Sequence, residues 1–258
     1  MSLIVLNFYS EALKMQTEAL VIMPQKGNYG EIGTNAKTQA GPYKSLYLLH
    51  GLTDDHTIWL RRTSIERYAS AYGICIVMPK ADRSFYSDMK YGMAYYTHIA
   101  KELPAIIHEY FNISDRQEDR FIAGLSMGGY GALKIGLREC GSFAACAGIS
   151  PCADIKSLHQ FREVFRPIWG DNIEIPDEDD LLWLAEAKKD APNRPRVYIG
   201  IGTEDYLYRN AQTLRKKLEE CNYDFTYRES PGTHCWDFWD EYIQYILKWM
   251  LEPETAAI

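Results

Sequence analysis

Residues 120–137 read RFIAGLSMGGYGALKIGL, and this stretch decides the fold. Arg120–Leu125 is mostly apolar and typical of a buried strand, whereas Met127–Cys140 has the spacing of a helix. Ser126 stands between them in a Gly-x-Ser-x-Gly pattern, with Gly124 and Gly128 two residues to either side. A sharp strand-to-helix turn lifts the serine clear of the sheet, and larger side chains at the two glycine positions would clash there. The stretch therefore predicts Ser126 as a nucleophile.

The rest of the chain alternates short β-type runs with helix-type stretches, which is typical of a sheet with helices on both faces. We predict strands, the first two of them antiparallel, at Leu3–Tyr9, Glu18–Met23, Ser45–His50, Ile74–Met78, Arg120–Leu125, Phe143–Ile149, Arg196–Ile201 and Asp224–Arg228. We predict helices at Thr57–Tyr72, Ala94–Tyr110 with a kink or break at Pro104, Met127–Cys140, Ala211–Cys221 and Trp236–Leu251.

Two stretches depart from this alternation. Asn28–Pro42 is a Gly-rich loop, and residues 151–192 form a long segment that we expect to be partly helical and to lie over the carboxyl edge of the sheet. The order of the elements and the strand–serine–helix turn predict an α/β-hydrolase fold with a mostly parallel central sheet. We expect residues 1–258 to form a single domain, with 151–192 as a cap-like excursion.

Composition narrows the classes of function. Hydrophobic residues make up 47% of the chain and charged residues 24%, a globular balance, and the net charge of −7 does not favour nucleic-acid binding. The first residues do not form a signal peptide, and no apolar run is long enough to span a membrane, so a cytoplasmic location is expected. The cysteines form no Cys-x-x-Cys pair, and reduced thiols are expected.

The general base should follow the nucleophile in the chain, because this fold orders its triad as serine, acid and histidine. His159 and His234 both lie after Ser126. His159 falls in the irregular 151–192 segment, where a surface or packing role is expected. His234 lies between the last predicted strand and the last helix, where the base belongs.

The acid should follow the strand Arg196–Ile201, where Glu204 and Asp205 offer two carboxylates. Asp205 is preferred, because its shorter side chain suits a loop that reaches the histidine ring. Glu204 is the alternative, since either acid can orient an imidazole.

Two backbone N–H groups are expected to form an oxyanion hole. One belongs to Met127, the residue after the nucleophile, and the other to Leu52, in the loop after the first central strand. Gly51 lets that loop turn closely. His50 precedes it at the strand end, and we expect it to bind the loop rather than to act as a base.

Four stretches resemble a known family: LLHGL at 48–52, WLRRT at 59–63, GLSMGGYG at 124–131 and GTHCWDFW at 232–239. They are similar to the tributyrin esterase branch of the esterase D superfamily, over nearly the whole chain. That superfamily includes S-formylglutathione hydrolases, feruloyl and acetylxylan esterases, and secreted mycolyltransferases. The glutathione-handling enzymes carry a cysteine after the Gly-Leu-Thr of the oxyanion loop, where this chain has Asp54 and Asp55.

The resemblance implies that Ser126, Asp205 and His234 form the triad and that Leu52 and Met127 form the oxyanion hole. It also implies short acyl chains, no cofactor, and association as a homo-oligomer. The 151–192 segment corresponds to the variable cap of the family, so the preferred acyl and alcohol groups do not carry over.

The expected activity is hydrolysis of small esters of short-chain acids through an acyl-serine intermediate. The alternatives are a feruloyl or acetylxylan-type esterase, a thioesterase of the formylglutathione type, and a binding module that has lost the chemistry. No His/Cys cluster has metal-ligand spacing and no loop has the phosphate-binding pattern, so no metal or nucleotide is expected. Four aromatic residues are candidate pocket walls: Trp59, Phe161, Trp169 and Trp236.

Overall fold

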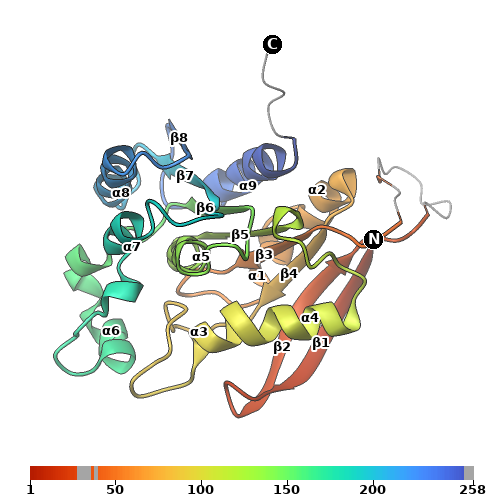
Figure 1. The fold of residues 1–258 in the computed structure, drawn as a ribbon, viewed down its shortest axis with the longest axis horizontal. Helices are drawn as coiled ribbons and strands as arrows, with labels where there is room; N and C mark the ends of the chain where they lie inside the picture. The colour runs from red at the N-terminus through yellow and green to blue at the C-terminus, as the bar shows by residue number, and fades with distance from the viewer. Residues whose placement is uncertain (28–35, 38–39, 253–258) are drawn as a thin grey trace.

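An eight-stranded sheet forms the centre of the computed structural model, which describes residues 1–27, 36–37 and 40–252 (Figure 1). Its strand order is β1-β2-β4-β3-β5-β6-β7-β8. The β1–β2 and β2–β4 pairs are antiparallel and the others parallel. The sequence predicts the antiparallel first pair and a mostly parallel sheet, but not the antiparallel β2–β4 pair. The strands are β1 (Ser2–Ser10), β2 (Met15–Met23), β3 (Ser45–Leu49), β4 (Cys75–Pro79), β5 (Arg120–Leu125), β6 (Ala145–Ile149), β7 (Arg196–Gly202) and β8 (Phe225–Ser230).

Helices cover both faces of the sheet, each over its own apolar cluster. One cluster lies under α1 (Ile58–Arg62), α2 (Ile65–Tyr72) and α9 (Trp236–Leu251). The other lies under the remaining helices, among them α5, which follows Ser126; Figure 1 shows α9 and α5 on opposite sides of the sheet. These helices are α3 (Tyr95–Thr97), α4 (Leu103–Tyr110), α5 (Met127–Arg138), α6 (Arg162–Trp169), α7 (Leu181–Ala187) and α8 (Tyr208–Glu220).

The helix predicted over 57–72 is divided into α1 and α2. Thr63 ends the first helix in an extended conformation, and its hydroxyl donates to the carbonyl of Trp59 at 2.6 Å. The same hydroxyl accepts the N–H of Ile65, the first residue of α2, at 3.1 Å. A side chain that satisfies both free helix ends makes the break stable.

The irregularity predicted at Pro104 takes the form of a wider turn. The helix runs from α3 through a π-helical stretch, His98–Glu102, directly into α4. Pro104 is the second residue of α4 and directly follows this wider turn, which accommodates a proline without breaking the helix.

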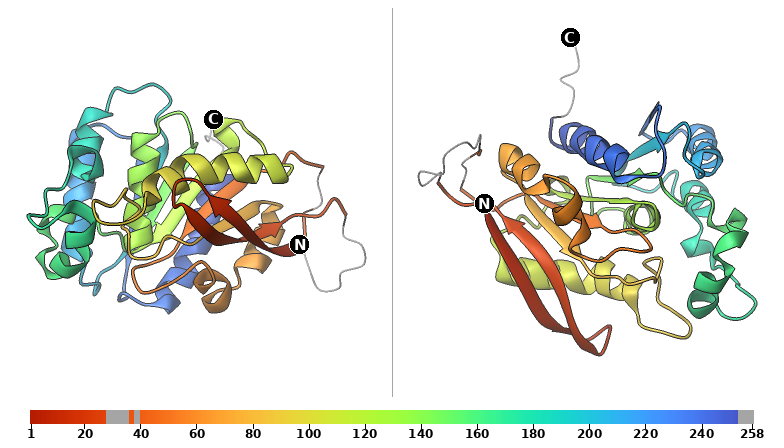
Figure 2. Two further views of the ribbon diagram at one scale, coloured as in Figure 1. Left: turned by 90° about the horizontal axis from the view of Figure 1, so that it is seen from below. Right: turned by 180° about the vertical axis from the view of Figure 1, so that it is seen from behind.

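Residues 151–192 are partly helical, as expected. They contain α6, α7 and short 3₁₀ turns at Ile155–Ser157, His159–Phe161 and Asp177–Asp179. Figure 2 shows that α6 and the β1–β2 hairpin lie at opposite ends of the molecule. Most of the loop predicted at Asn28–Pro42 lies outside the described residues.

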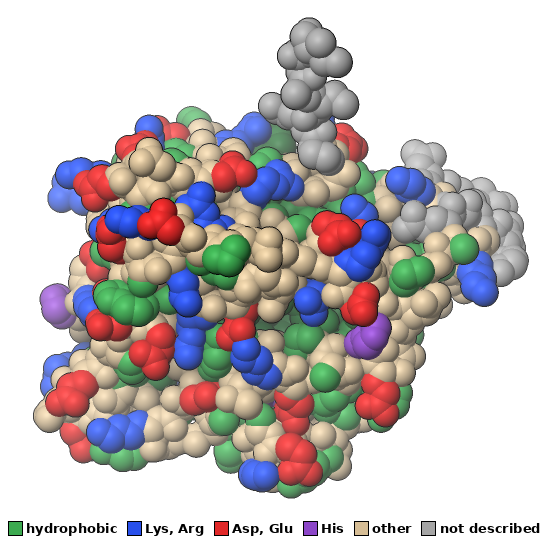
Figure 3. All heavy atoms as spheres, in the orientation of Figure 1, with side chains coloured by type: hydrophobic (Ala, Val, Ile, Leu, Met, Phe, Trp, Pro, Cys, Tyr) green, Lys and Arg blue, Asp and Glu red, His purple; other side chains and the backbone are tan. Residues whose placement is uncertain are grey.

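The surface in Figure 3 carries basic and acidic side chains interspersed, without a basic stripe on that face. Among the described helices, none is long and apolar enough to cross a membrane. All six cysteines are free thiols, which agrees with the prediction.

Candidate active site

Ser126 lies at the turn between β5 and α5 in a conformation that side chains rarely adopt, with φ 53° and ψ −116°. The packing around the turn explains the two flanking glycines. A Cβ on Gly128 would lie 2.4 Å from the carbonyl oxygen of Leu49, and one on Gly124 would lie 2.4 Å from the carbonyl oxygen of Gly128. Both distances are far shorter than a real contact, so the turn requires glycine at both positions.

The side chain of His234 joins Ser126 to Asp205. Its Nε2 atom lies 3.0 Å from Oγ of Ser126, and its Nδ1 atom lies 2.8 and 3.1 Å from the carboxylate oxygens of Asp205. A carboxylate only accepts, so Nδ1 carries the proton and Nε2 is free to accept the serine hydroxyl. The Asp205 side chain is fully buried and also accepts the N–H of Leu207 at 2.8 Å, which fixes its orientation.

The structure separates the two alternatives that the sequence leaves open. The carboxylate of Asp205 binds the imidazole, whereas the carboxylate of Glu204 accepts the N–H of Gly232 at 2.5 Å. His159 lies in a different cavity, of about 360 Å³, among residues of the 151–192 segment. Neither residue is brought to Ser126.

The loop after β3 runs beside the nucleophile. A Cβ on Gly51 would lie 3.8 Å from Cβ of Ser126 and 2.7 Å from Cδ1 of Leu125, so the backbone approaches closely there. Leu52 lines the same cavity as Ser126. Met127 is the first residue of α5, and its N–H has no partner within the helix. One expected oxyanion donor thus lies in the loop after β3 and the other at the start of α5, and both segments lie beside Ser126.

His50 holds this loop in place through hydrogen bonds of its ring. Its Nε2 atom accepts the N–H of Ala81 at 3.0 Å, so its proton is on Nδ1, which donates to the carbonyl of Gly51 at 2.8 Å. Burial lowers the pKa of the imidazole and keeps it neutral. The structural role predicted for His50 agrees with these contacts.

A cavity of about 210 Å³ opens beside Ser126. Phe161, one of the predicted pocket walls, is among its lining residues. The full lining is Gly51, Leu52, Thr53, Asp54, Phe85, Leu125, Ser126, Cys152, Phe161, Tyr206, His234 and Trp239.

The structure corrects the prediction for the other three aromatic walls. Trp59 donates its indole N–H to the carbonyl of Leu49 at 3.0 Å and packs edge-on against Trp236, on the α9 face of the sheet. Trp169 donates to Asp179 at 2.7 Å and packs against Phe165. None of these three rings is among the lining residues of the cavity. Trp169 and Trp236 lie behind rings that do line it, because Trp169 packs on Phe85 and Trp236 packs on Trp239.

Several residues that line the cavity were missed. Tyr206 and Trp239 pack on the His234 ring, with centroids 4.6 and 4.9 Å away. Tyr206 directly follows the acid, and Trp239 lies one helical turn after the base, so proximity to the triad could have indicated both. Phe85 comes from the loop after β4, and no sequence signal marks it.

Among the described residues that line this cavity, Asp54 is the one with an acidic side chain, and none is Lys or Arg. Burial raises the pKa of the Asp54 carboxyl, partly offset by a hydrogen bond with the Gly51 backbone. Burial also raises the pKa of Tyr206 to about 12, which keeps its hydroxyl neutral. The cavity therefore has apolar walls and, from Asp54, a carboxyl group in its lining.

A nucleophile, a base and a buried acid connected in this way are typical of serine hydrolases. The family model named Esterase matches residues 10–250. The chain belongs to this esterase family. It is a carboxylic ester hydrolase with the α/β-hydrolase fold.

Individual members of the esterase family show the extent of the similarity. An acetyl esterase of Caldicellulosiruptor saccharolyticus is 28% identical over 97% of this chain and 98% of its own. FphF, a fluorophosphonate-binding serine hydrolase of Staphylococcus aureus, is 31% identical with a TM-score of 0.86. An S-formylglutathione hydrolase, FrmB, of the same organism is 32% identical with a TM-score of 0.85. For both structures the match covers 97% of this chain and 98% of the other.

Proposed function

We propose that this esterase hydrolyses small, uncharged esters of short-chain acids, with Ser126, His234 and Asp205 as its catalytic triad. The observation that carries the proposal is the continuous hydrogen-bonded chain from Oγ of Ser126 through the imidazole to Asp205. The tributyrin esterases, the short-chain branch that the sequence resembles, are the branch that we propose for this protein.

The reaction proceeds through an acyl-serine intermediate. His234 takes the hydroxyl proton as Oγ attacks the ester carbonyl, and the backbone N–H groups of Leu52 and Met127 bind the developing oxyanion. The imidazolium then gives its proton to the leaving alcohol. A water molecule, deprotonated by the same imidazole, releases the acid and restores the free serine. Asp205 holds the tautomer and stabilises the imidazolium.

The cavity favours a small acyl group. Its volume is about 210 Å³, below the ~300–1,000 Å³ of pockets that hold drug-sized ligands. Phe85 and Phe161 line it, with ring centroids 6.2 Å apart. Acetyl to butyryl groups are therefore the expected acyl chains, in keeping with the acetyl esterase among the relatives.

A thioesterase acting on S-formylglutathione is the second candidate, because FrmB is 32% identical to this chain. Against it stands Asp54 in the cavity lining, where the glutathione-handling enzymes carry cysteine. Glutathione has two carboxylates, which an ionised Asp54 side chain would repel. A small uncharged ester fits this site better.

The first test is hydrolysis of p-nitrophenyl esters from acetate to octanoate, with methyl ferulate and S-formylglutathione alongside, by wild type and Ser126→Ala. We expect activity that falls beyond butyrate and is absent from the variant. Dominant turnover of ferulate or S-formylglutathione would replace the short-chain assignment. A protein that turns over none of them and does not react with a fluorophosphonate would be a binding module.

A further inference from the structure

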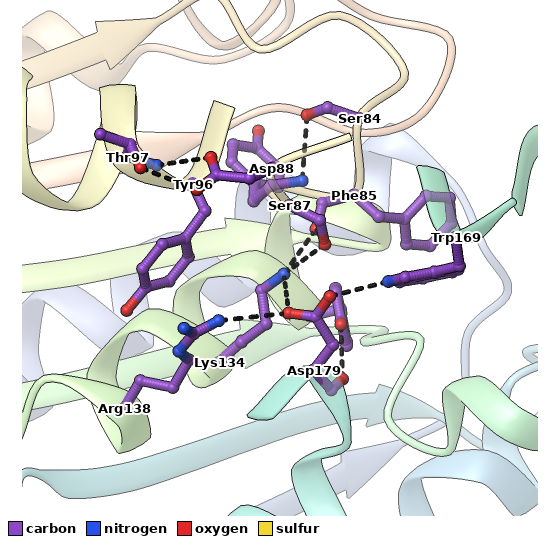
Figure 4. Close-up of polar contacts among 12 residues, drawn as sticks. Ser84, Phe85, Ser87, Asp88, Tyr96, Thr97, Lys134, Arg138, Trp169 and Asp179 are labelled. Carbon is purple, nitrogen blue, oxygen red and sulfur yellow. Dashed lines mark hydrogen bonds and ion pairs between the residues drawn. The ribbon is translucent and has the colours of Figure 1, made fainter. Parts of the chain in front are cut away.

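Lys134 is a fully buried lysine on α5, the helix that begins at the nucleophile. Its ammonium group donates three hydrogen bonds: to the carbonyl of Phe85 at 3.1 Å, to Oγ of Ser87 at 2.6 Å and to Oδ1 of Asp179 at 3.0 Å (Figure 4). An ammonium group has three donors. Every one of them is used, although the residues that accept them lie far from Lys134 in the chain.

Asp179 extends this contact into the 151–192 segment. Its Oδ2 atom accepts the indole N–H of Trp169, on α6, at 2.7 Å, and its backbone carbonyl accepts the hydroxyl of Tyr130 at 2.5 Å. Arg138 adds a longer bond to Oδ1 at 3.4 Å. One carboxylate therefore joins the nucleophile helix to helix α6 (Figure 4).

The other partner of Lys134 leads to the active-site cavity. Phe85 lines that cavity, and both Phe85 and Tyr86 have positive φ, at 48° and 51°. Such backbone persists only where its surroundings hold it. Here two hydrogen bonds from Lys134, one to the Phe85 carbonyl and one to Oγ of Ser87, hold the backbone of Phe85 and Tyr86. The neighbouring Asp88 fixes the following turn by accepting the N–H and hydroxyl of Thr97.

The rings above this network form one cluster. Phe85 packs against Phe161, Phe165 and Trp169, with ring centroids 6.2, 5.1 and 6.3 Å away. The network holds this cluster at two points, because Lys134 binds the backbone of Phe85 and Asp179 binds the indole of Trp169. Phe85 and Phe161 are also walls of the active-site cavity.

We propose that the Lys134–Asp179 ion pair is a positioning device that sets the acyl-chain selectivity of Ser126. The ion pair holds the backbone of Phe85 against the nucleophile helix, and it holds α6 at the same point. The distance between the two walls of the acyl cavity, Phe85 and Phe161, therefore stays constant. This inference rests on the proposed function for its selectivity, whereas the anchoring itself does not depend on the substrate. Lys134 touches no substrate and acts through Phe85.

The test replaces Lys134 with Met, which keeps the chain length and removes the ammonium group. The concentration of active sites is measured by titration with a fluorophosphonate, so that kcat/KM refers to folded enzyme only. We expect the ratio of kcat/KM for p-nitrophenyl hexanoate to that for the acetate to change by about tenfold, the discrimination that one methylene gives in an apolar pocket. Ser87→Ala, which removes one of the three acceptors, should move the ratio in the same direction by less, and it serves if Lys134→Met does not fold.

The matched control is Leu133→Ala. Leu133 is the adjacent fully buried residue of α5, and its Cδ1 atom lies close to Gly148 of β6. Its apolar side chain has no group that could bind the Phe85 carbonyl or Asp179. It should lower stability without changing the ratio. A Lys134→Met ratio equal to that of wild type and of Leu133→Ala would overturn the proposal.

Hydrogen exchange gives a second readout that needs no turnover. In Lys134→Met, we expect the amides of both segments, 81–94 and 162–180, to exchange faster than in wild type. In Leu133→Ala, we do not expect faster exchange in both segments at once. Unchanged exchange in both segments would also overturn the anchor. If the wild-type protein has no esterase activity, the proposed function is wrong. The exchange experiment would still decide whether Lys134 holds the two segments.

Discussion

Glu204 and Asp205 are neighbours in the chain, but their carboxylates bind different partners. Asp205 accepts from Nδ1 of His234 at 2.8 Å, whereas Glu204 accepts the N–H of Gly232 at 2.5 Å. The first contact orients the base and the second ties the loop after β7 to the loop that carries the base. The two acids should therefore differ sharply when each is replaced by its amide.

Asp205→Asn should lower kcat by about 10⁴-fold, because an amide favours the wrong tautomer of the imidazole. Glu204→Gln should change kcat by only about twofold, since its amide oxygen can still accept the N–H of Gly232. Steady-state kinetics on p-nitrophenyl acetate compares the two variants. The reverse order would move the catalytic acid to Glu204.

Ser126→Ala should lower turnover by about 10⁴–10⁶-fold and abolish labelling by a fluorophosphonate. The variant should fold normally, because the substitution removes a single hydroxyl group, which binds His234, and leaves the backbone of the turn unchanged. Circular dichroism and thermal unfolding provide the control. Near-full activity in a folded variant would exclude Ser126 as the nucleophile.

Gly51→Ala should impair the oxyanion hole. The new Cβ would lie 2.7 Å from Cδ1 of Leu125 and 2.9 Å from Oδ2 of Asp54, so either these side chains or the loop that carries the Leu52 N–H must shift. Loss of one oxyanion donor lowers kcat by about 10²–10³-fold, and we expect a decrease approaching that range with little change in KM. A variant with wild-type kcat would show that Leu52 does not bind the oxyanion.

Asp54→Asn should make the cavity more tolerant of negative charge. At alkaline pH, where a carboxyl group is ionised, removing the charge of Asp54 should raise kcat/KM for a p-nitrophenyl hemisuccinate about tenfold relative to p-nitrophenyl butyrate, or about 1.4 kcal/mol. The uncharged ester is the internal control. Equal effects on both esters would mean that the charge of Asp54 does not select substrates.

The Lys134–Asp179 pair should contribute to acid sensitivity. Burial alone would raise the pKa of Asp179, but the Lys134 charge and the hydrogen bond from Trp169 lower it below its ordinary value. The folded state therefore binds fewer protons than the unfolded chain, and this stability is present above the ordinary carboxyl pKa of about 3.9 and is lost as pH falls through the lower folded pKa.

Asp179→Asn should lower the free energy of unfolding at neutral pH by about 3–5 kcal/mol, because it leaves the Lys134 charge without its partner. Below about pH 4 the gap between the two proteins should narrow. Urea unfolding across this range measures both effects. Glu102 and Asp119, whose pKa values are lowered by hydrogen bonds despite burial, are present in both proteins, so the difference isolates Asp179. A constant gap would contradict the assignment.

The strand–serine–helix turn could be predicted because it depends on neighbouring residues. Gly124 and Gly128 are required by contacts within a few residues of Ser126 and with the adjacent β3. His234 could be chosen because the fold fixes its order in the chain. The acid was harder, since Glu204 and Asp205 share one loop and only the folded backbone decides which of them points to the imidazole.

The pocket walls could not be predicted. Tryptophans near catalytic loops are reasonable candidates, but an indole must both bury its ring and satisfy its N–H, and the partners that do this for Trp59 and Trp169 are in the core. Phe85 reaches the cavity through left-handed backbone that no local pattern indicates. Its anchor, Lys134, looks in sequence like an ordinary helix lysine.

The sequence alone determined the alternation of strands and helices, the nucleophile turn and the order of the triad, because periodicity, glycine and chain order are local or one-dimensional properties. Tertiary structure alone decided which carboxylate binds His234, which rings face Ser126, and that Lys134 meets Asp179 across 45 residues. These depend on which side chains become neighbours once the sheet and its helices pack, and on how each buried polar group finds a partner there.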